Sequence, residues 1–474
     1  MCSSDLIHNA LKKRGAAISS YWLQDWVGTR KTTLGTRLQW NWDLDEKRYP
    51  RFKKLISDLN RDNIEVMGYI NPFLSKIDNL DSSRTNFYDE FAKNGYLIKN
   101  KSGKPYPTDS GGFSGTLIDF TNEKARNKTK DIIKDMIKLG FKGWMADFGE
   151  AMPFNAVLDS GESAETYHNA YPTEWAKVNA EAISEMGETD NIFTFHRSAY
   201  SGSQKYASTY WTGDQMVTWD EHDGFKTAIL AMTTSGMSGM ALNHSDIGGY
   251  VSISLPVAGT NLSIYTRSNE LLNRWLEMNA FSPFLRTHDG IVPGVNSQFY
   301  SDAKNLELFV YFSKVYAALF DYRKSVFTEA SEKGYPATRP LYAHFEDDPE
   351  VYNIKYQYLL GADLLVAPVV EKSQLTWEVY LPEGQNWEHL WSKKIYKGGQ
   401  KVKVRAEIGK PPVFFNPSNG LLKEAQKKIL SIPRNWASMP EDVIPCLSNY
   451  EEAGEDGYSK QGGETCFVMP ELKN

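Results

Sequence analysis

The chain has 474 residues, of which 41% are hydrophobic, 13% aromatic and 24% charged, so it is long enough to bury a large core. Its net charge is −6, and no block of Lys or Arg provides the basic footprint of a nucleic-acid-binding protein. No stretch is long and apolar enough for a transmembrane helix, and the eight His and three Cys show no metal-binding spacing, so we expect neither a membrane nor a metal partner.

Short apolar runs alternate with helical patterns from residue 16 to about residue 290. The strand-like runs are 16–25, 64–74, 143–148, 192–198, 208–214, 239–246 and 284–288. A helical pattern over 122–140 places four apolar residues on one face and ends at Gly140. Apolar strands that alternate with helices indicate a parallel sheet in an α/β fold.

Nearly every strand candidate ends in polar residues that can bind or react. In a (β/α)8 barrel, the carboxyl ends of all strands converge on one mouth, where the active site is built. Seven strand candidates are present, and the first begins close to the N-terminus. The prediction is therefore a (β/α)8 TIM barrel that lacks its first strand and spans residues 1–338.

The sequence changes character after Gly334. Short strand-like runs follow, with turns at Pro382–Gly384 and at Gly398–Gly399. This pattern predicts a small antiparallel β-sandwich domain over 339–418. The remaining tail, 419–474, has one helical pattern and then a polar run, so we expect it to be partly disordered.

Two aspartates end separate strand candidates in similar surroundings, Asp147 in WMADFGE and Asp214 in YWTGDQ. Cleavage of a glycosidic bond needs one carboxylate at the oxocarbenium-like carbon and one acid that protonates the leaving oxygen. The alternative is that each Asp only caps the following helix. Glu150 and Asp246 are rival carboxylates, which we interpret as supporting groups.

The motifs WMADFGE, FHRSAYSGSQ, YWTGDQ, HSDIGGY and FLRTHDG, in this order, resemble glycoside hydrolase family 31. GADLLVAPVV followed by WEVYLPEG resembles the C-terminal β-domain of that family. The resemblance covers about residues 16–418 and implies a retaining α-glycosidase with Asp147 as nucleophile and Asp214 as acid/base. It implies a sugar glycoside as the small-molecule partner, with Arg197 and His288 on sugar hydroxyls, and no cofactor. It leaves open whether the chain forms a homo-oligomer.

Within the family, α-glucosidases carry a D-x-D pattern where this chain has WLQDW, and an Asn-Glu pair where it has DFGE. The chain is similar instead to the sulfoquinovosidase branch, which implies that Gln24, Arg37, Trp40 and Tyr250 bind a sulfonate, with Asp25 beside them. A sulfonate offers only acceptor oxygens, which an Arg fork and an indole N–H can satisfy. The alternative is that Arg37 forms a salt bridge with Asp43 or Asp45 and that Trp40 belongs to the core.

Two further readings stay open. One is a family-31 α-glucosidase that acts on a neutral α-glucoside. The other is an inactive remnant or a binding protein, because the chain lacks the N-terminal β-sandwich, the first barrel strand and the Gln that the branch uses on that strand. The link Val251–Thr266, beside the expected pocket, is longer than is usual in the family.

Overall fold

The computed structural model describes residues 3–32, 35–77, 80–110, 113–257 and 260–438. It divides the chain into two compact units, which are residues 18–210 and residues 1–17 with 211–474. We call these the first unit and the second unit. Only residues 439–474 of the predicted tail lie outside the described residues at that end.

A parallel sheet forms the centre of the first unit. Its strands lie in the order β1, β4, β8, β9 and β10, and Tyr69 pairs with Met145, which in turn pairs with Phe195. The bounds are β1 Ser20–Trp22, β4 Glu65–Ile70, β8 Gly143–Ala146, β9 Phe193–His196 and β10 Thr209–Trp211. All five strands lie inside predicted strand runs, and their parallel pairing confirms the predicted α/β class.

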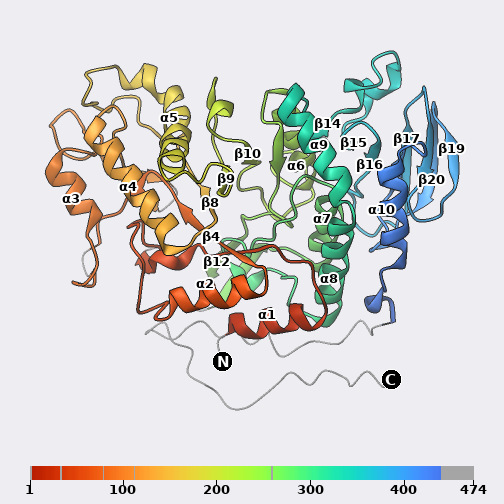
Figure 1. Ribbon diagram of the computed structural model, residues 1–474, viewed down its shortest axis with the longest axis horizontal. Helices are drawn as coiled ribbons and strands as arrows, with labels where there is room; N and C mark the ends of the chain where they lie inside the picture. Colours follow the sequence, from red (N-terminus) through yellow and green to blue (C-terminus); the bar gives the residue numbers. More distant parts are fainter. Residues whose placement is uncertain (1–2, 33–34, 78–79, 111–112, 258–259, 439–474) are drawn as a thin grey trace. The chain divides into compact units, whose positions relative to one another are not determined.

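Helices α4 (Glu123–Leu139) and α5 (Ala164–Glu185) lie side by side and pack on this sheet (Figure 1). The Nε1 atom of Trp144 in β8 donates to the Oδ1 atom of Asn179 in α5 at 2.8 Å. Gly68 in β4 lies so close to α4 that a Cβ atom would be 3.2 Å from Met136. Helix α4 ends at Gly140, whose φ of +103° is left-handed, as the sequence predicts.

Smaller elements follow the strands of the first unit. After β1 come the 3-10 helix η1, the hairpin β2–β3 and helix α2, and after β4 come β5, α3 and the β6–β7 pair. Their bounds are η1 Asp25–Val27, β2 Thr29–Thr32, β3 Gly35–Leu38, α2 Phe52–Arg61, β5 Phe73–Leu74, α3 Phe87–Asn94, β6 Thr108–Ser110, β7 Phe113–Leu117 and η2 Ser203–Lys205.

The second unit contains most of the long helices. Its elements up to residue 333 are α1 Ser3–Lys13, α6 Phe225–Met237, β11 Leu242–His244, β12 Ile253–Val257, β13 Thr260–Tyr265, α7 Asn269–Ala280, η3 Pro293–Val295, α8 Ala303–Ala318 and α9 Phe320–Lys333. An ion pair of 2.6 Å between Arg14 and Glu307 joins the end of α1 to α8. Within the long link 251–266, strands β12 and β13 pair in antiparallel fashion.

The strand predicted over 284–288 is wrong. Among the described residues, this segment makes a single isolated bridge, between Ile247 and Thr287. The carbonyl oxygen of Phe284 accepts from the Ser282 hydroxyl at 2.9 Å, so a side chain takes an acceptor that a strand would use in its ladder.

The later part of the second unit is antiparallel, as predicted. One sheet has the order β14, β15, β16, β21, β18 and β19, and a second pairs β17 with β20. Buried Leu359, Leu365, Trp387 and Phe414 share one core cluster. The bounds are β14 Thr338–Arg339, η4 Leu341–Ala343, η5 Pro349–Asn353, β15 Tyr358–Leu360, β16 Leu364–Val366, β17 Thr376–Leu381, β18 Asn386–His389, β19 Ile395–Lys397, β20 Gln400–Arg405, β21 Val413–Phe415, α10 Gly420–Ser431 and η6 Asn435–Ser438.

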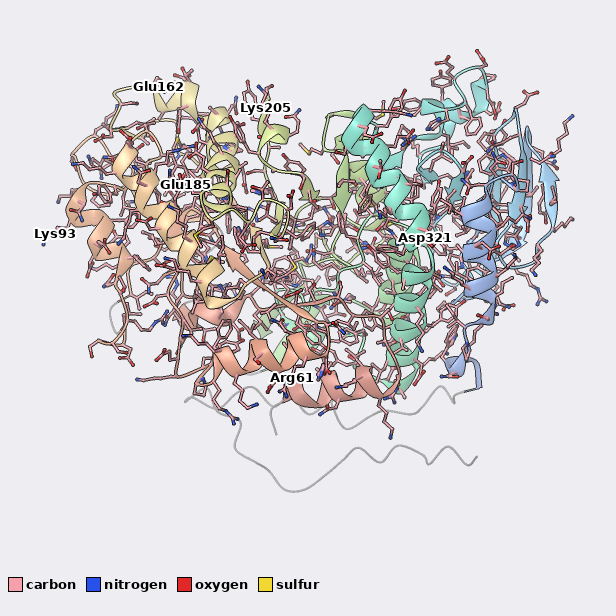
Figure 2. All side chains as sticks on the ribbon, viewed as in Figure 1. Arg61, Lys93, Glu162, Glu185, Lys205 and Asp321 are labelled. Atoms are coloured by element: carbon pink, nitrogen blue, oxygen red, sulfur yellow. The ribbon has the colours of Figure 1, made fainter. Side chains whose placement is uncertain are left out.

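Some charged side chains of the helices and loops are exposed to solvent. The six labelled in Figure 2 are all exposed: Arg61, Lys93, Glu162, Glu185, Lys205 and Asp321. Among the described residues, no helix combines the length and apolar character that crossing a membrane requires.

Candidate active site

Asp147 follows directly after β8. Its backbone N–H donates to the carbonyl oxygen of Ile70 at 2.9 Å, which continues the pairing of β8 with β4 for one more residue. The next residue, Phe148, has a left-handed φ of +56°, so the chain turns sharply behind the carboxylate. Asp147 is only 7% exposed.

Three donors hold the Asp147 carboxylate. The Tyr69 hydroxyl donates to Oδ2 at 2.5 Å, and the backbone N–H of Phe148 donates to Oδ1 at 2.8 Å. The Nη1 atom of Arg197 lies 3.2 Å from Oδ1. Burial raises the pKa of Asp147, and Arg197 and the two hydrogen bonds oppose that rise. The carboxylate is therefore desolvated but electrostatically supported, as a nucleophile in a closed site requires.

Arg197, at the end of β9, links the two carboxylates of the DFGE motif. Besides Asp147, it binds Glu150 through Nε at 2.8 Å and through Nη2. Its guanidinium carbon lies 4.0 Å from the ring centroid of Phe148. The Glu150 side chain is 43% exposed, which agrees with a supporting group that orients Arg197. A contact of Arg197 with a sugar hydroxyl stays a prediction.

Trp40 connects the predicted sulfonate pocket to the Asp147 turn. Its ring is buried, stacks on Phe73 at 5.2 Å and meets Phe148 edge-on at 5.4 Å. Trp40 therefore packs within the first unit, as the core alternative expects, and it also touches the residue next to Asp147. Gln24, which directly precedes η1, and Arg37, in strand β3, are both half-buried.

Asp45 and Asp43, the salt-bridge partners considered for Arg37, both contact other residues, and a salt bridge of Arg37 with either one stays a prediction. The Arg84 guanidinium lies 3.8 Å from the Asp45 carboxylate, and the Thr85 N–H donates to Asp43 at 2.9 Å. Asp25, predicted to bind substrate, accepts from Arg48 Nε at 2.7 Å and from the Tyr49 hydroxyl at 2.5 Å. These contacts give Asp25 a structural role, whereas its contact with substrate stays a prediction.

Asp214 belongs to the second unit, where it is exposed on the turn after β10. Gly213 before it has a left-handed φ of +84°. Gln215 after it accepts from the N–H groups of Tyr250 at 2.7 Å and Val251 at 2.9 Å. The predicted acid/base and the predicted sulfonate ligand Tyr250 are thus held on two loops that are hydrogen-bonded to each other.

His288 packs against Tyr250, with ring centroids 4.7 Å apart. Burial lowers the pKa of His288 well below its ordinary value, and the nearby Arg286 and Arg267 lower it further. The Gly290 N–H donates to Nδ1 at 3.0 Å, so the neutral ring carries its hydrogen on Nε2. Such a ring can donate a hydrogen bond to a sugar oxygen, as the sequence predicts.

Asp246 lies next to the same loops but is held by protein. Arg286 pairs with its Oδ1 atom and also donates from Nε to His244 at 2.8 Å. Burial raises the pKa of Asp246, and Arg286 partly offsets that rise. These contacts are compatible with a supporting group, and the role of Asp246 stays a prediction.

Arg267 holds the turn before Tyr250 and the segment after His288, although the sequence analysis did not identify it as a site residue. Its side chain donates to the carbonyl oxygens of Ile247, Gly249, Asp289 and Ser297 and to the side chain of Gln298. The residue is only 1% exposed. These bonds join the turn before Tyr250 to the segment after His288.

Tyr69 was missed as well. It lies on β4 at the position that pairs with Met145, two residues before Asp147, so strand alternation points its side chain to the same face as the carboxylate. That alternation, together with the polar group on Tyr, is the signal that could have identified it.

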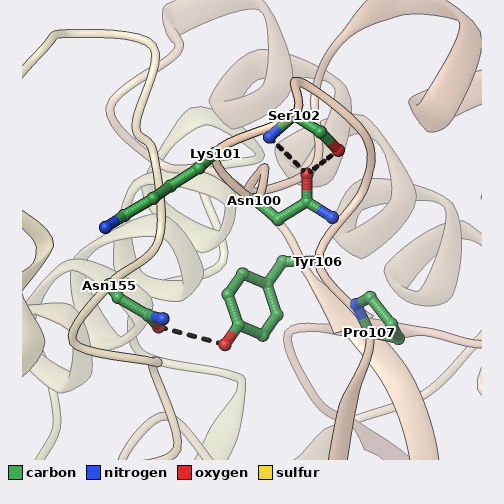
Figure 3. A pocket seen from close by; sticks show the side chains of 6 residues that line it. All are labelled: Asn100, Lys101, Ser102, Tyr106, Pro107 and Asn155. Carbon is green, nitrogen blue, oxygen red and sulfur yellow. Dashed lines mark hydrogen bonds between the residues drawn. The ribbon is translucent and has the colours of Figure 1, made fainter.

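A separate pocket of about 400 Å³ lies on the loops that follow β4 and β8 in the first unit (Figure 3). Its lining is Asn100, Lys101, Ser102, Tyr106, Pro107 and Asn155, and the Tyr106 hydroxyl donates to Asn155 at 3.0 Å. This lining has no carboxylate and none of the predicted site residues. Among the described residues, no cluster of three or more His, Cys, Asp or Glu side chains forms a metal site.

Two family profiles match the chain. Residues 6–323 match the profile described as "Glycosyl hydrolases family 31 TIM-barrel domain", and residues 334–419 match "Glycosyl hydrolase family 31 C-terminal domain". The predicted TIM-barrel class and the antiparallel β-domain after it are confirmed. The predicted domain limits stay predictions.

Several relatives share most of the chain. A sulfoquinovosidase of Escherichia coli (strain K12) is 42% identical over 408 residues, which are 86% of this chain and 58% of the relative. A sulfoquinovosidase of Agrobacterium fabrum (strain C58) is 39% identical over 85% of this chain and 59% of the relative. The solved structure of "a GH31 family sulfoquinovosidase from E. rectale in complex with aza-sugar inhibitor IFGSQ" superposes with a TM-score of 0.83 at 39% identity, over 90% of this chain and 62% of that one.

Proposed function

The chain belongs to glycoside hydrolase family 31, and from this premise we propose that it releases sulfoquinovose from α-sulfoquinovosides by double displacement. The chain spans about three fifths of the length of the relatives it matches, so this activity is a proposal for the chain as it stands. In the proposal, Asp147 is the nucleophile and Asp214 is the general acid and base.

The surroundings of Asp147 carry the catalytic part of the proposal. A buried carboxylate that accepts hydrogen bonds from Tyr69 and from a backbone N–H, and that forms an ion pair with Arg197, is fixed in position, and its charge is compensated. A nucleophile that attacks an anomeric carbon needs both properties, because it must be desolvated and still remain ionised. In contrast, a carboxylate that only capped a helix would lie at the surface and bind N–H groups of the next turn.

The loops of Tyr250 and His288 support the same reading from the second unit. The exposed Asp214 lies one residue before Gln215, which binds the Tyr250 loop, so an acidic group that can meet a ligand is tied to two predicted sugar-binding residues. In the double displacement, Asp214 gives its proton to the leaving oxygen and later takes a proton from the attacking water.

The choice of a sulfonated sugar depends on Gln24, Arg37, Trp40 and Tyr250. One observation of the structure supports it: Trp40 packs against the residue beside Asp147. A permanent anion with three acceptor oxygens suits an Arg fork, which supplies fixed, paired donors. The sulfoquinovosidases of E. coli and A. fabrum, at 42% and 39% identity, also support it.

The test is hydrolysis of 4-nitrophenyl α-sulfoquinovoside, compared with 4-nitrophenyl α-glucoside. We expect activity on the sulfonated substrate, its loss in Asp147→Asn, and a fall of about 100-fold or more in kcat/KM for Arg37→Ala on that substrate alone, the scale of a lost charge-assisted contact. Arg61→Ala, which removes an exposed cation from α2, is the matched control and should change neither rate. Activity on the glucoside only would favour a neutral α-glucosidase, and inactivity of the folded chain on both would favour the binding-protein reading.

A further inference from the structure

The two oxygens of the Asp147 carboxylate have different partners. Oδ1 accepts a hydrogen bond from the Phe148 N–H and lies 3.2 Å from the cationic Nη1 of Arg197, whereas among the described residues of the first unit Oδ2 accepts one hydrogen bond, from Tyr69. A carboxylate oxygen has two lone pairs in its plane. Oδ1 therefore faces two donor groups of the protein, and Oδ2 keeps one lone pair for a bond to carbon.

The donor on Oδ2 is fixed by a chain of three hydrogen bonds. The backbone N–H of Phe73 donates to Asn71 Oδ1 at 2.9 Å, and Asn71 Nδ2 donates to the Tyr69 oxygen at 3.0 Å. The Tyr69 hydroxyl then donates to Asp147 Oδ2 at 2.5 Å. A backbone N–H can only donate, so the Phe73 N–H fixes which end of the Asn71 amide faces it. The Asn71 NH2 group then donates to the Tyr69 oxygen, and the Tyr69 hydroxyl must donate toward Asp147. All three side chains are buried.

We propose that Oδ2 of Asp147 is the attacking oxygen and that Tyr69, oriented by Asn71, is a catalytic residue that assists the departure of this oxygen in the second displacement. This inference rests on the proposed function, because it assumes that Asp147 forms a covalent bond to the sugar. It adds a role for Tyr69 and Asn71 that the two-aspartate mechanism alone does not contain.

The chemistry of the two steps explains why they differ. In the first step, Oδ2 forms a bond to the anomeric carbon while the bond from that carbon to the leaving oxygen breaks, and the general acid protonates the leaving oxygen. Oδ2 then becomes a neutral ester oxygen, which is a weaker acceptor for Tyr69. In the second step, water attacks the carbon, its proton goes to the general base, and the C–O bond to Oδ2 breaks with the electron pair returning to Oδ2.

Tyr69 therefore binds Oδ2 most strongly at the start and at the end of the cycle. At the start, its hydrogen bond reduces the nucleophilicity of Oδ2, and at the end it stabilises the charge that returns to Oδ2. Removal of the hydroxyl should consequently slow deglycosylation by about 10- to 100-fold, the scale of one hydrogen bond to a charged group. Glycosylation should not slow, because the variant loses a hydrogen bond that weakens the attacking oxygen.

The experiment follows both steps in the full chain with 4-nitrophenyl α-sulfoquinovoside, an activated leaving group. We expect Tyr69→Phe to show a burst of nitrophenol followed by slow turnover, and intact-mass spectrometry to detect the glycosyl adduct on Asp147. Tyr171→Phe is the matched control, because its hydroxyl is also buried in the first unit but donates to the Ile118 carbonyl at 2.7 Å. This control should show neither the burst nor the adduct.

Asn71→Asp keeps the Tyr69 hydroxyl in place but changes the direction in which that hydroxyl donates its hydrogen bond. The new carboxylate can still accept from the Phe73 N–H, but it would also accept from the Tyr69 hydroxyl and draw that hydrogen away from Asp147. We expect this variant to accumulate the adduct as Tyr69→Phe does. Equal slowing of both steps in the two variants, or slow turnover without an adduct, would overturn the proposal.

Failure of the proposed function gives a different result. If the unmodified chain neither hydrolyses the substrate nor forms an adduct, the double displacement by Asp147 is wrong for this chain. The Tyr69 contact is then measured by the carboxyl 13C shift of Asp147 against pH: its hydrogen bond lowers the pKa of Asp147, so Tyr69→Phe should raise that pKa. An unchanged pKa would overturn the assignment of Tyr69 to Oδ2 in either case.

Discussion

Replacement of Arg267 tests how the loops of the second unit are held. Arg267→Met keeps most of the aliphatic stem but removes every donor of the guanidinium. Five hydrogen bonds are lost, to the carbonyl oxygens of Ile247, Gly249, Asp289 and Ser297 and to the side chain of Gln298. All five acceptors are uncharged, and they stay behind in a region where Arg267 itself is almost fully buried.

The expected cost follows from two opposing effects. Hydrogen bonds to a charged group contribute about 1.5–3 kcal/mol each, which for five bonds gives about 7 kcal/mol or more. Burial of the cation costs several kcal/mol and is relieved in the variant. That cost is visible in the pKa of Arg267, which burial lowers to about 10, so the cation still persists at neutral pH. The difference between these two effects leads us to expect a fall of about 3–5 kcal/mol in the free energy of unfolding.

Urea unfolding followed by tryptophan fluorescence measures this change, and amide hydrogen exchange over 247–251 locates it. The control is Arg405→Met, whose side chain is 85% exposed in the same unit and which should change the unfolding free energy by less than about 0.5 kcal/mol. Because Arg267 holds the turn before Tyr250, kcat/KM should also fall in the part of the population that remains folded. A fall of less than about 1 kcal/mol in the free energy of unfolding, with unchanged amide exchange at 247–251, would refute the idea that Arg267 holds these loops together.

Three further substitutions test the site at separate points. Gly249→Ala places a Cβ 2.6 Å from the Met216 carbonyl oxygen at a φ of +79°, so it should lower stability by about 1–3 kcal/mol in thermal unfolding and weaken substrate binding. Gly115→Ala places a Cβ 2.8 Å from the Trp40 ring, and a displaced indole should lower kcat/KM for the sulfonated substrate by about 10-fold, the scale of one weakened contact. Burial raises the pKa of Asp147, so ionisation of this residue destabilises the fold above the ordinary carboxyl pKa of about 3.9. Asp147→Asn should therefore raise Tm near pH 7, and a calorimetric pH series should show the gain disappear toward pH 3.

The sequence predicts where the residues of the candidate site lie better than it predicts the hydrogen bonds between them. Polar residues at the ends of apolar runs locate Asp147 and Arg197 correctly at the ends of β8 and β9, because a parallel sheet delivers its carboxyl ends to one side. The same reasoning fails at 284–288, where a side-chain hydroxyl takes a backbone acceptor and the segment makes only a single bridge. A residue such as Ser282, which can compete for backbone groups, does not alter the apolar pattern on which strand prediction depends.

Residues that act through others are harder to predict. Arg267 lies in an ordinary polar stretch, and its five acceptors come from segments 18 to 31 residues away, so no local spacing shows that it is central. Tyr69 belongs to an apolar strand in which a tyrosine usually fills space. Only the register of β4 against β8 shows that its hydroxyl reaches Asp147.

Phe148 shows that a sequence motif can indicate the chemistry of a site without revealing its geometry. Its left-handed backbone aims its own N–H at the Asp147 carboxylate, a conformation that costs energy for a bulky residue. The contacts of its ring with the Arg197 guanidinium, at 4.0 Å, and with the Trp40 ring, at 5.4 Å, offset this energy. One side chain thus joins the residue proposed as the nucleophile to a residue proposed for the sulfonate. We therefore expect a change at Arg197 or Trp40 to shift the Asp147 carboxylate. In the proposed function, the residues that select the sugar would then also influence the rate of attack.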